Sequence, residues 1–255
     1  MVDEQKENDL GEGTLLSHLV ELRSRLFKIF GAVFIVFLAL LPFSKMIFDL
    51  AAEPLTSVIP DGELQALNPA APLTATIGLT FYLALFISMP LILYQVWAFV
   101  APGLYRKEKR FTVPLLATSI LLFFLGIAFA YFVVFPMIFG FISAFAPDSM
   151  EYKPDATAYV SFIMMVVLVF GFAFETPIAT VLLVMTGLTT TDKLKKARPY
   201  VFLGAFVVGM LLTPPDMISQ TMLAIPVYLL YELGIFMSRL VSTRKAEPAE
   251  EAAVK

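Results

Sequence analysis

Three acidic side chains stand where a carboxylate could do chemistry: Glu21, Glu108 and Glu175. Glu21 falls on one helical face with His18 and Arg25, because residues three, four and seven apart lie on the same side of an α-helix. A carboxylate on that face can bind a cationic ligand. It can equally form an ordinary Glu21–Arg25 pair on a solvated face, worth roughly a few tenths of a kcal/mol. The residue pattern alone leaves both interpretations open.

Glu108 is the one acid in a strongly basic run, Arg106-Lys107-Glu108-Lys109-Arg110. One interpretation is a positively charged cytoplasmic loop in which the acid only relieves repulsion between its neighbours. The other is an anionic docking point. Taken by itself, the loop does not decide between them.

Glu175 lies inside a long apolar stretch, two residues before Pro177. An ionisable group at that depth is costly to bury and therefore marks a functional position by default. One use for it is as the proton carrier of a secondary transporter for a small solute. The structural alternative is a hydrogen-bonded carboxyl that ties helices together.

The composition says what must position these carboxylates. Of 255 residues, 59% are hydrophobic and 15% are charged, and the mean hydropathy is +0.83. Soluble domains are about half apolar and about a quarter charged, so the sequence predicts an all-α membrane protein. The chain has no cysteine and only one histidine, which excludes thiolate metal sites and imidazole clusters. We therefore expect no metal, no cofactor and no enzymatic activity.

Six segments are candidates for membrane-spanning helices, which need about 20 mostly apolar residues each. They run from Phe27 to Phe43, Pro72 to Val100, Phe111 to Phe145, Ala158 to Leu188, Pro199 to Leu212 and Met217 to Met237. Leucines at helical spacing also predict an amphipathic interfacial helix from Thr14 to Lys28, leading into the first span. The predicted domains are a disordered acidic head (1–13), a single six-span domain (14–240) and a disordered cytoplasmic tail (241–255).

The distribution of lysine and arginine predicts the orientation. All of these residues except Lys45 and Lys153 fall in the N-terminal segment, the loops after the second and fourth spans, and the C-terminal tail. This is the positive-inside pattern, and it predicts that both termini are cytoplasmic. No transit segment is visible before the first span, which favours a bacterial inner membrane.

Prolines and span length predict the shape. Bent helices in a curved arrangement are expected, because prolines fall in or at the edges of spans at Pro90, Pro114, Pro136, Pro177 and Pro226. Spans five and six are expected to be short; the fifth gives only about 21 Å of helix before the chain turns. Short spans, and the lack of a visible three-plus-three repeat, count against the small-solute transporter.

Four stretches of the chain resemble the TatC family of the twin-arginine protein translocase. They are His18 to Leu26, Phe99 to Arg110, Phe170 to Pro177 and Leu211 to Phe236. The resemblance implies a receptor and scaffold that binds Arg-Arg signal peptides on the cytoplasmic face for export of folded proteins, driven by the proton-motive force. It also implies single-span TatA-like and TatB-like partners and several copies per complex in the lipid bilayer, with no role for nucleic acid.

The resemblance also implies roles for individual residues. Glu21 and Glu108 occupy the arginine-binding positions, and Arg23 and Phe99 belong to the same recognition surface. A planar guanidinium forms two charge-assisted hydrogen bonds to a carboxylate, which a lysine ammonium cannot imitate, so two carboxylates can distinguish Arg-Arg from Lys-Lys. The resemblance marks Met210, Thr213 and Gln220, on or beside the fifth span, as contacts for a partner.

Overall fold

The computed structural model describes residues 2–56, 64–100, 112–145, 153–212 and 217–253. The described backbone is helical and contains no strand, only an isolated bridge between Gln65 and Asp155. The elements are α1 (Val2–Leu40), η1 (Leu41–Phe43), α2 (Ser44–Thr56), α3 (Ala71–Ile87), α4 (Met89–Val100), α5 (Thr112–Phe129), the π-helical turn η4 (Ala130–Val134), α6 (Phe135–Phe145), α7 (Ala156–Met185), α8 (Thr191–Leu212) and α9 (Met217–Ala253).

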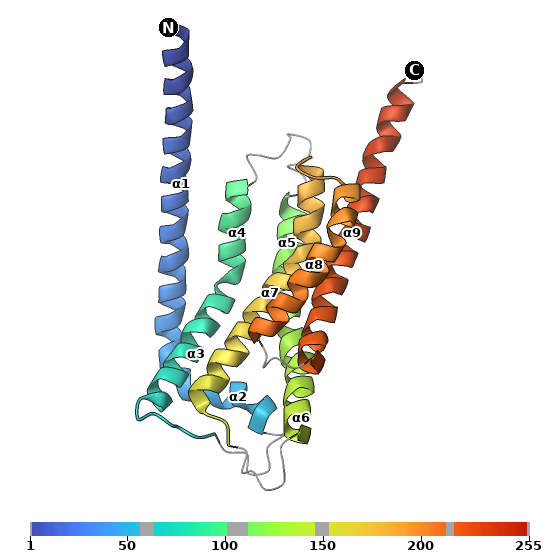
Figure 1. Ribbon diagram of the computed structural model, residues 1–255. Helices are drawn as coiled ribbons and strands as arrows, with labels where there is room; N and C mark the ends of the chain where they lie inside the picture. The colour runs from blue at the N-terminus through green and yellow to red at the C-terminus, as the bar shows by residue number, and fades with distance from the viewer. Residues whose placement is uncertain (1, 57–63, 101–111, 146–152, 213–216, 254–255) are drawn as a thin grey trace.

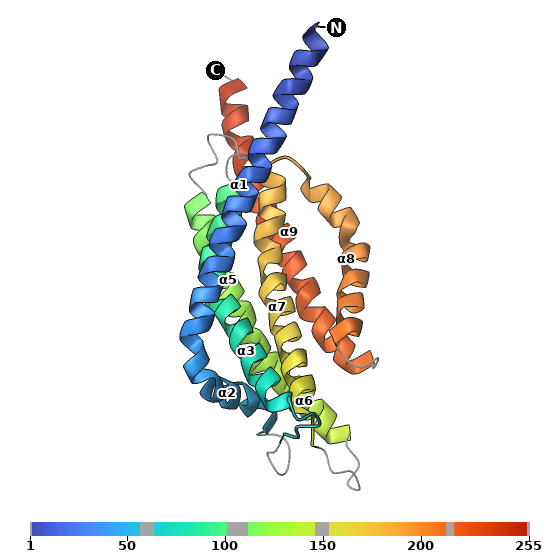
Figure 2. The same ribbon diagram turned by 90° about the vertical axis from the view of Figure 1, so that its left-hand side faces the viewer.

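The helices run roughly along one direction, and both chain ends lie at the same end of the molecule, hereafter the termini end (Figure 1). The short helix α2, the turn η1 before it and residues 64–70 before α3 lie at the opposite end (Figure 1). Helix α7 is central and packs against α3, α5 and α9, while α1 packs on α3 and α4. Helix α8 packs mainly on α9, and the two form a hairpin at one side (Figure 2).

Four helical stretches in the described part of the chain are long and apolar enough to cross a membrane. They are Leu19–Thr56, Val113–Ala144, Ala156–Met185 and Met217–Leu240; α3 and α4 together make a fifth if the bent pair is one span. The chain is thus a multi-pass helical membrane protein. The predicted fifth span lies in α8, which does not meet the same test, so the count of six remains a prediction.

The bend between α3 and α4 is 49° and falls where the sequence predicts one. Pro90 stands in the first turn of α4, where its missing N–H and its ring prevent the preceding helix from continuing. A π-helical turn, η4, precedes the predicted bend at Pro136. By contrast, α7 continues as one helix through Pro177.

One expectation about lengths differs from the structure. Helix α1 begins at Val2 and α9 continues to Ala253, and the predicted domain boundaries near the two ends stay a prediction. The expectation of a short sixth span is wrong, because the apolar part of α9 runs for 24 residues from Met217 to Leu240, enough to cross the hydrocarbon layer.

The end opposite the termini is tied together by Asp155, the N-cap of α7. Its carboxylate accepts hydrogen bonds from the backbone N–H groups of Ala158 (2.9 Å) and Leu67 (3.2 Å). These bonds, that from Ala158 first, hold the pKa of Asp155 below its usual value. Since Leu67 belongs to the segment before α3, this one side chain both starts α7 and anchors the α2–α3 connection.

Helices α5 and α7 approach so closely that two glycines are required between them. A Cβ on Gly126 would lie 2.6 Å from the carbonyl oxygen of Phe170, and a Cβ on Gly171 would lie 2.6 Å from Cε2 of Phe123. Both phenylalanines are fully buried members of the apolar core. In lipid, such close packing by small residues is a main source of helix association.

We predict that Gly126→Ala destabilises the fold by about 1–3 kcal/mol, because the new methyl group would meet backbone that cannot move aside. Gly140→Ala is the matched control, since a Cβ there meets nothing within 4 Å. The measurement is the thermal unfolding midpoint of both variants in detergent. Equal midpoints for the two variants would contradict the close α5–α7 contact.

Candidate functional site

The predicted Glu21–Arg25 pair is present on α1, and it is not a simple solvated pair. Arg25 Nη2 lies 2.5 Å from Glu21 Oε1, and Arg25 Nε donates to the same oxygen at 3.0 Å. Arg25 also donates from Nη1 to Gln95 Oε1 (3.0 Å) and from Nη2 to the Ala98 carbonyl (3.2 Å). The guanidinium therefore fastens α1 to the last two turns of α4, near the termini end.

The other predicted recognition residues flank this junction. Phe99 follows Ala98 on α4 and is partly buried. Arg23 is exposed, with its guanidinium carbon 5.6 Å from the centre of the Phe27 ring, a cation–π distance. Glu108 lies outside the described residues, so its position relative to Glu21 remains a prediction. The structure thus brings Glu21, Arg25 and the end of α4 together.

Glu175 is a hydrogen-bonded carboxyl between helices, which is one of the two alternatives that the sequence allows. Its Oε2 accepts a hydrogen bond from the Ser119 hydroxyl of α5, and Trp97 Nε1 of α4 donates to that same hydroxyl at 3.4 Å. One carboxyl thereby links three helices. Its other oxygen, Oε1, is buried and has no hydrogen-bond partner among the described residues. An unpaired buried acceptor costs free energy, so a further hydrogen-bond donor that reached this oxygen would stabilise the site.

The predicted partner contacts lie on the α8–α9 hairpin. Met210 is 52% exposed at the end of α8, and Thr213 lies outside the described residues. Gln220, in the first turns of α9, donates from Nε2 to the Phe206 carbonyl at 2.7 Å. Gly209 permits this crossing, because a Cβ there would lie 3.1 Å from Gln220. Gln220 thus already pairs within the hairpin, and Met210 is one of several exposed apolar residues near the same end of the hairpin, with Leu211 and Met217.

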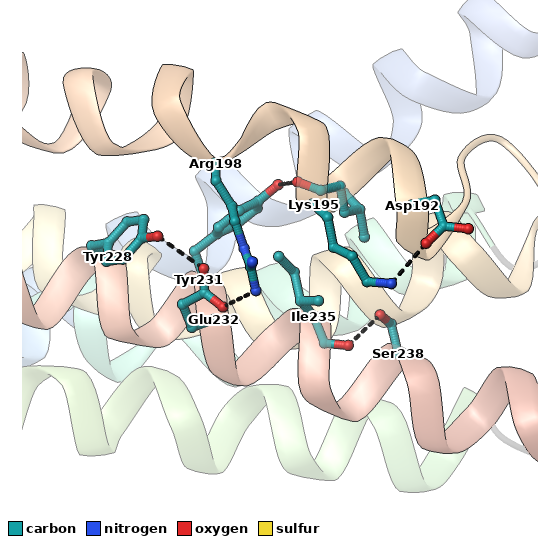
Figure 3. Close-up of polar contacts among 9 residues, drawn as sticks. Asp192, Lys195, Arg198, Tyr228, Tyr231, Glu232, Ile235 and Ser238 are labelled. Atoms are coloured by element: carbon teal, nitrogen blue, oxygen red, sulfur yellow. Dashed lines mark hydrogen bonds and ion pairs between the residues drawn. The ribbon is translucent and has the colours of Figure 1, made fainter.

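Glu232, for which the sequence predicts no role, joins a polar cluster between α8 and α9 (Figure 3). Arg198 Nη2 lies 2.6 Å from Glu232 Oε2, and the Tyr228 hydroxyl donates to Glu232 Oε1 at 2.9 Å. The Tyr231 hydroxyl donates to the Leu194 carbonyl at 2.7 Å, again from α9 to α8. A signal existed in the sequence: Arg198 and Glu232 lie at similar distances along the chain from residues 213–216, so two antiparallel helices on either side of that segment bring the opposite charges together.

The fold and these sites define a class: a multi-pass helical membrane protein with a partly exposed carboxylate near the termini end, a buried carboxyl between helices and an apolar hairpin face. Comparisons with known proteins identify the family. The family model described as Sec-independent protein translocase protein (TatC) matches residues 17–226. The chain belongs to this family, whose members are protein translocase components.

Individual relatives agree along nearly the whole chain. The Sec-independent protein translocase protein TatC of Escherichia coli (strain K12) is 51% identical over 226 residues, 88% of each chain. That of Aquifex aeolicus (strain VF5) is 39% identical over 235 residues, 91% of this chain and 98% of the relative. A crystal structure of "Twin Arginine Translocase Receptor- TatC" superposes with a TM-score of 0.80 at 39% identity, covering 88% of this chain and 99% of that chain.

These comparisons confirm the resemblance stated from the sequence. They also count against the hypothesis of a small-solute transporter, because the members of this family are protein translocase components. The roles of single residues, the orientation and the partners are not decided by family membership and are taken up as proposals below.

We predict that Glu175→Ala lowers the free energy of unfolding by about 1–3 kcal/mol, because the buried Ser119 hydroxyl loses its acceptor. Glu175→Gln should cost less, since the amide oxygen can still accept that bond. Trp97 is the only tryptophan, so its fluorescence can follow thermal unfolding in detergent. Ser161→Ala is the control, because among the described residues the Ser161 hydroxyl bonds within its own helix, to the Thr157 carbonyl. A native midpoint for Glu175→Ala would show that the carboxyl does not tie the helices.

Proposed function

We propose that this protein is the receptor and scaffold subunit of a twin-arginine translocase. It binds Arg-Arg signal peptides on the cytoplasmic face and serves the export of folded proteins driven by the proton-motive force. The observation that carries the proposal is the partly exposed Glu21 carboxylate, which Arg25 holds against the end of α4. Arg23 lies two residues after Glu21, and Phe99 directly follows Ala98. The related crystal structure is itself described as a twin-arginine translocase receptor.

The proposed orientation has six spans with both termini in the cytoplasm of a bacterium. Its support is the location of both chain ends at one end of the molecule (Figure 1), together with the lysine and arginine bias along the sequence. On this orientation the Glu21–Arg25 junction faces the cytoplasm, where a precursor arrives. The α2 cap and Asp155 face the other side.

Recognition is proposed to use two carboxylates, Glu21 and Glu108, one for each arginine of the signal. A guanidinium presents several N–H donors in one plane to a carboxylate, while an ammonium is a point charge. Phe99 supplies apolar surface beside them, and the basic neighbours of Glu108 reduce nonspecific attraction of other cations. Selectivity for Arg-Arg then comes from geometry rather than from charge alone.

The partner surface is proposed to be the face of the α8–α9 hairpin around Met210, with Thr213 and Gln220 at its turn. The apolar part of α8 is about 21 Å long, less than the hydrocarbon thickness, so polar groups near the turn lie in apolar surroundings unless a neighbour or thinned bilayer meets them. A single-span TatA-like or TatB-like helix with a polar side chain would do so. Glu175 Oε1 is a second polar point that a partner or signal helix could bind.

We predict that Glu21→Ala and Glu108→Ala each weaken binding of an Arg-Arg precursor by roughly tenfold to a hundredfold, the effect of losing a charge-assisted fork of about 1.5–3 kcal/mol. Glu→Gln variants separate charge from shape. Glu53→Ala is the matched control, an exposed acid on α2 at the opposite end. Site-specific crosslinking of the precursor is the measurement. Native crosslinking by the Glu21→Ala, Glu108→Ala double variant would disprove the docking assignment.

We further predict that single cysteines at Met210, Leu211 and Leu212 form disulfides with cysteines in the membrane helix of a TatB-like or TatA-like partner. The mapping is free of interference because the chain has no cysteine of its own. Cysteine at Phe132, an exposed residue of η4, is the comparison position. Strong crosslinks at Phe132 and none on α8 would move the partner site to the third span.

A further inference from the structure

We propose that Arg25 is a positioning residue for arginine recognition: it holds Glu21 by one carboxylate oxygen and leaves the other for an incoming guanidinium. The inference rests on the proposed function, since it specifies how Glu21 is presented to the signal peptide. Arg25 itself does not bind the signal peptide. Its role is to set the direction and position of the Glu21 carboxylate, which does.

The first support is that both contacts from Arg25 converge on a single oxygen. Nε (3.0 Å) and Nη2 (2.5 Å) both donate to Glu21 Oε1. Oε2 has no hydrogen bond to any other described residue, and the Glu21 side chain is 38% exposed. A carboxylate offers about four acceptor positions, two on each oxygen, so Oε1 can serve Arg25 while Oε2 accepts two N–H groups of a second guanidinium.

The second support is that Arg25 is itself held from the far side. Nη1 donates to Gln95 Oε1 at 3.0 Å, and Nη2 also donates to the Ala98 carbonyl at 3.2 Å. Gln95 is 8% exposed and the Arg25 side chain is 20% exposed, so this half of the junction is packed. An unrestrained Glu on a helix surface would lose rotamer freedom on binding. Glu21 has lost much of it already, which is how a fixed supporting shell increases affinity.

The third support is what the α4 contacts fix in space. Ala98 immediately precedes Phe99 near the end of α4. By bonding Ala98 and Gln95, Arg25 sets the position of Glu21 relative to the helix that carries Phe99. Lysine cannot replace Arg25, because the four bonds to Glu21, Gln95 and Ala98 come from three separate nitrogens, whereas an ammonium has three donors on one nitrogen.

A rival interpretation treats Arg25 as an internal competitor that occupies Glu21 until a signal arginine displaces it. The two interpretations predict opposite signs. A competitor weakens binding, so its removal tightens it; a positioning residue strengthens binding and selectivity, so its removal lowers both. The structure favours positioning, because the bonds to Gln95 and Ala98 would keep Arg25 in place even without Glu21.

The test measures binding of labelled Arg-Arg and Lys-Lys signal peptides to the purified full chain in detergent, by fluorescence anisotropy. Arg25→Gln and Arg25→Lys should each lower the ratio of Arg-Arg to Lys-Lys affinity by about tenfold, the effect of one lost charge-assisted hydrogen bond. Arg25→Lys retains the charge, so a fall there isolates the geometry of the fork. Gln95→Leu should lower the ratio in the same direction but less, because it removes only one of the four bonds.

The control is Lys28→Gln, which removes an exposed positive charge from the same helix and should leave the ratio unchanged. Emission from Trp97, 6% exposed on α4, shows whether each variant retains the native packing. If Arg25→Gln fails to fold, Arg25→Lys and Gln95→Leu decide the question. An unchanged ratio in these variants, or tighter Arg-Arg binding, overturns the inference.

Glu21→Gln separates this inference from the proposed function. If Glu21→Gln binds the Arg-Arg peptide as tightly as the native chain, Glu21 is not a docking group and the receptor assignment of that residue fails. If Glu21→Gln loses binding while the Arg25 variants keep the native ratio, the docking role stands and only the positioning role fails. A merely structural Arg25 would lower binding of both peptides equally and leave the ratio unchanged, which also counts against the inference.

Discussion

The cost of an unpaired polar group in hydrocarbon governs this structure. Without water, each backbone N–H and C=O must bond within its own helix, which is why the membrane part is built of helices. Hydroxyl side chains follow the same rule: Thr80 and Thr118 donate to carbonyls one turn earlier, at Thr76 and Pro114. Pairing inside each helix leaves few polar groups available to join one helix to another, so each junction between helices is specific.

Two kinds of contact join the helices. One is close approach at small residues, as at Gly126 and Gly171 between α5 and α7, where packing alone supplies the attraction. The other is a charged or polar side chain that forms hydrogen bonds to a neighbouring helix. Arg25 of α1 bonds to α4, Arg198 of α8 bonds to α9, and Glu175 of α7 bonds to α5. The first kind of contact sets the distance between two helices without placing any polar or ionisable group between them. The second kind places ionisable groups in the fold, and the proposed sites are found among these.

Hydropathy predicted the long helices because their burial in lipid is a local property of about 20 residues. The bend at Pro90 and the Glu21–Arg25 pair were predictable for the same reason, since each depends on residues less than about two turns apart. The partners of Arg25 on α4, of Glu175 on α5 and of Arg198 on α9 were not. They join residues 70, 56 and 34 positions apart, and only the packing of the helices brings them together. The length of the last span was also underestimated, because its end was predicted at Met237 whereas the membrane-compatible stretch of α9 continues to Leu240.

Helix α4 is the element that the two carboxylate sites share. Near its end, Gln95 and Ala98 accept hydrogen bonds from Arg25, and Trp97 between them donates to Ser119, which in turn bonds Glu175. Gln95 and Trp97 are both buried, so neither contact is a loose surface interaction. The bend at Ser88 and Pro90 separates this segment from α3, so α4 has its own direction. It follows that a displacement of α4 by even an ångström would alter the hydrogen bonds at Arg25 and at Ser119 together, because one rigid helical turn carries the contacts of both.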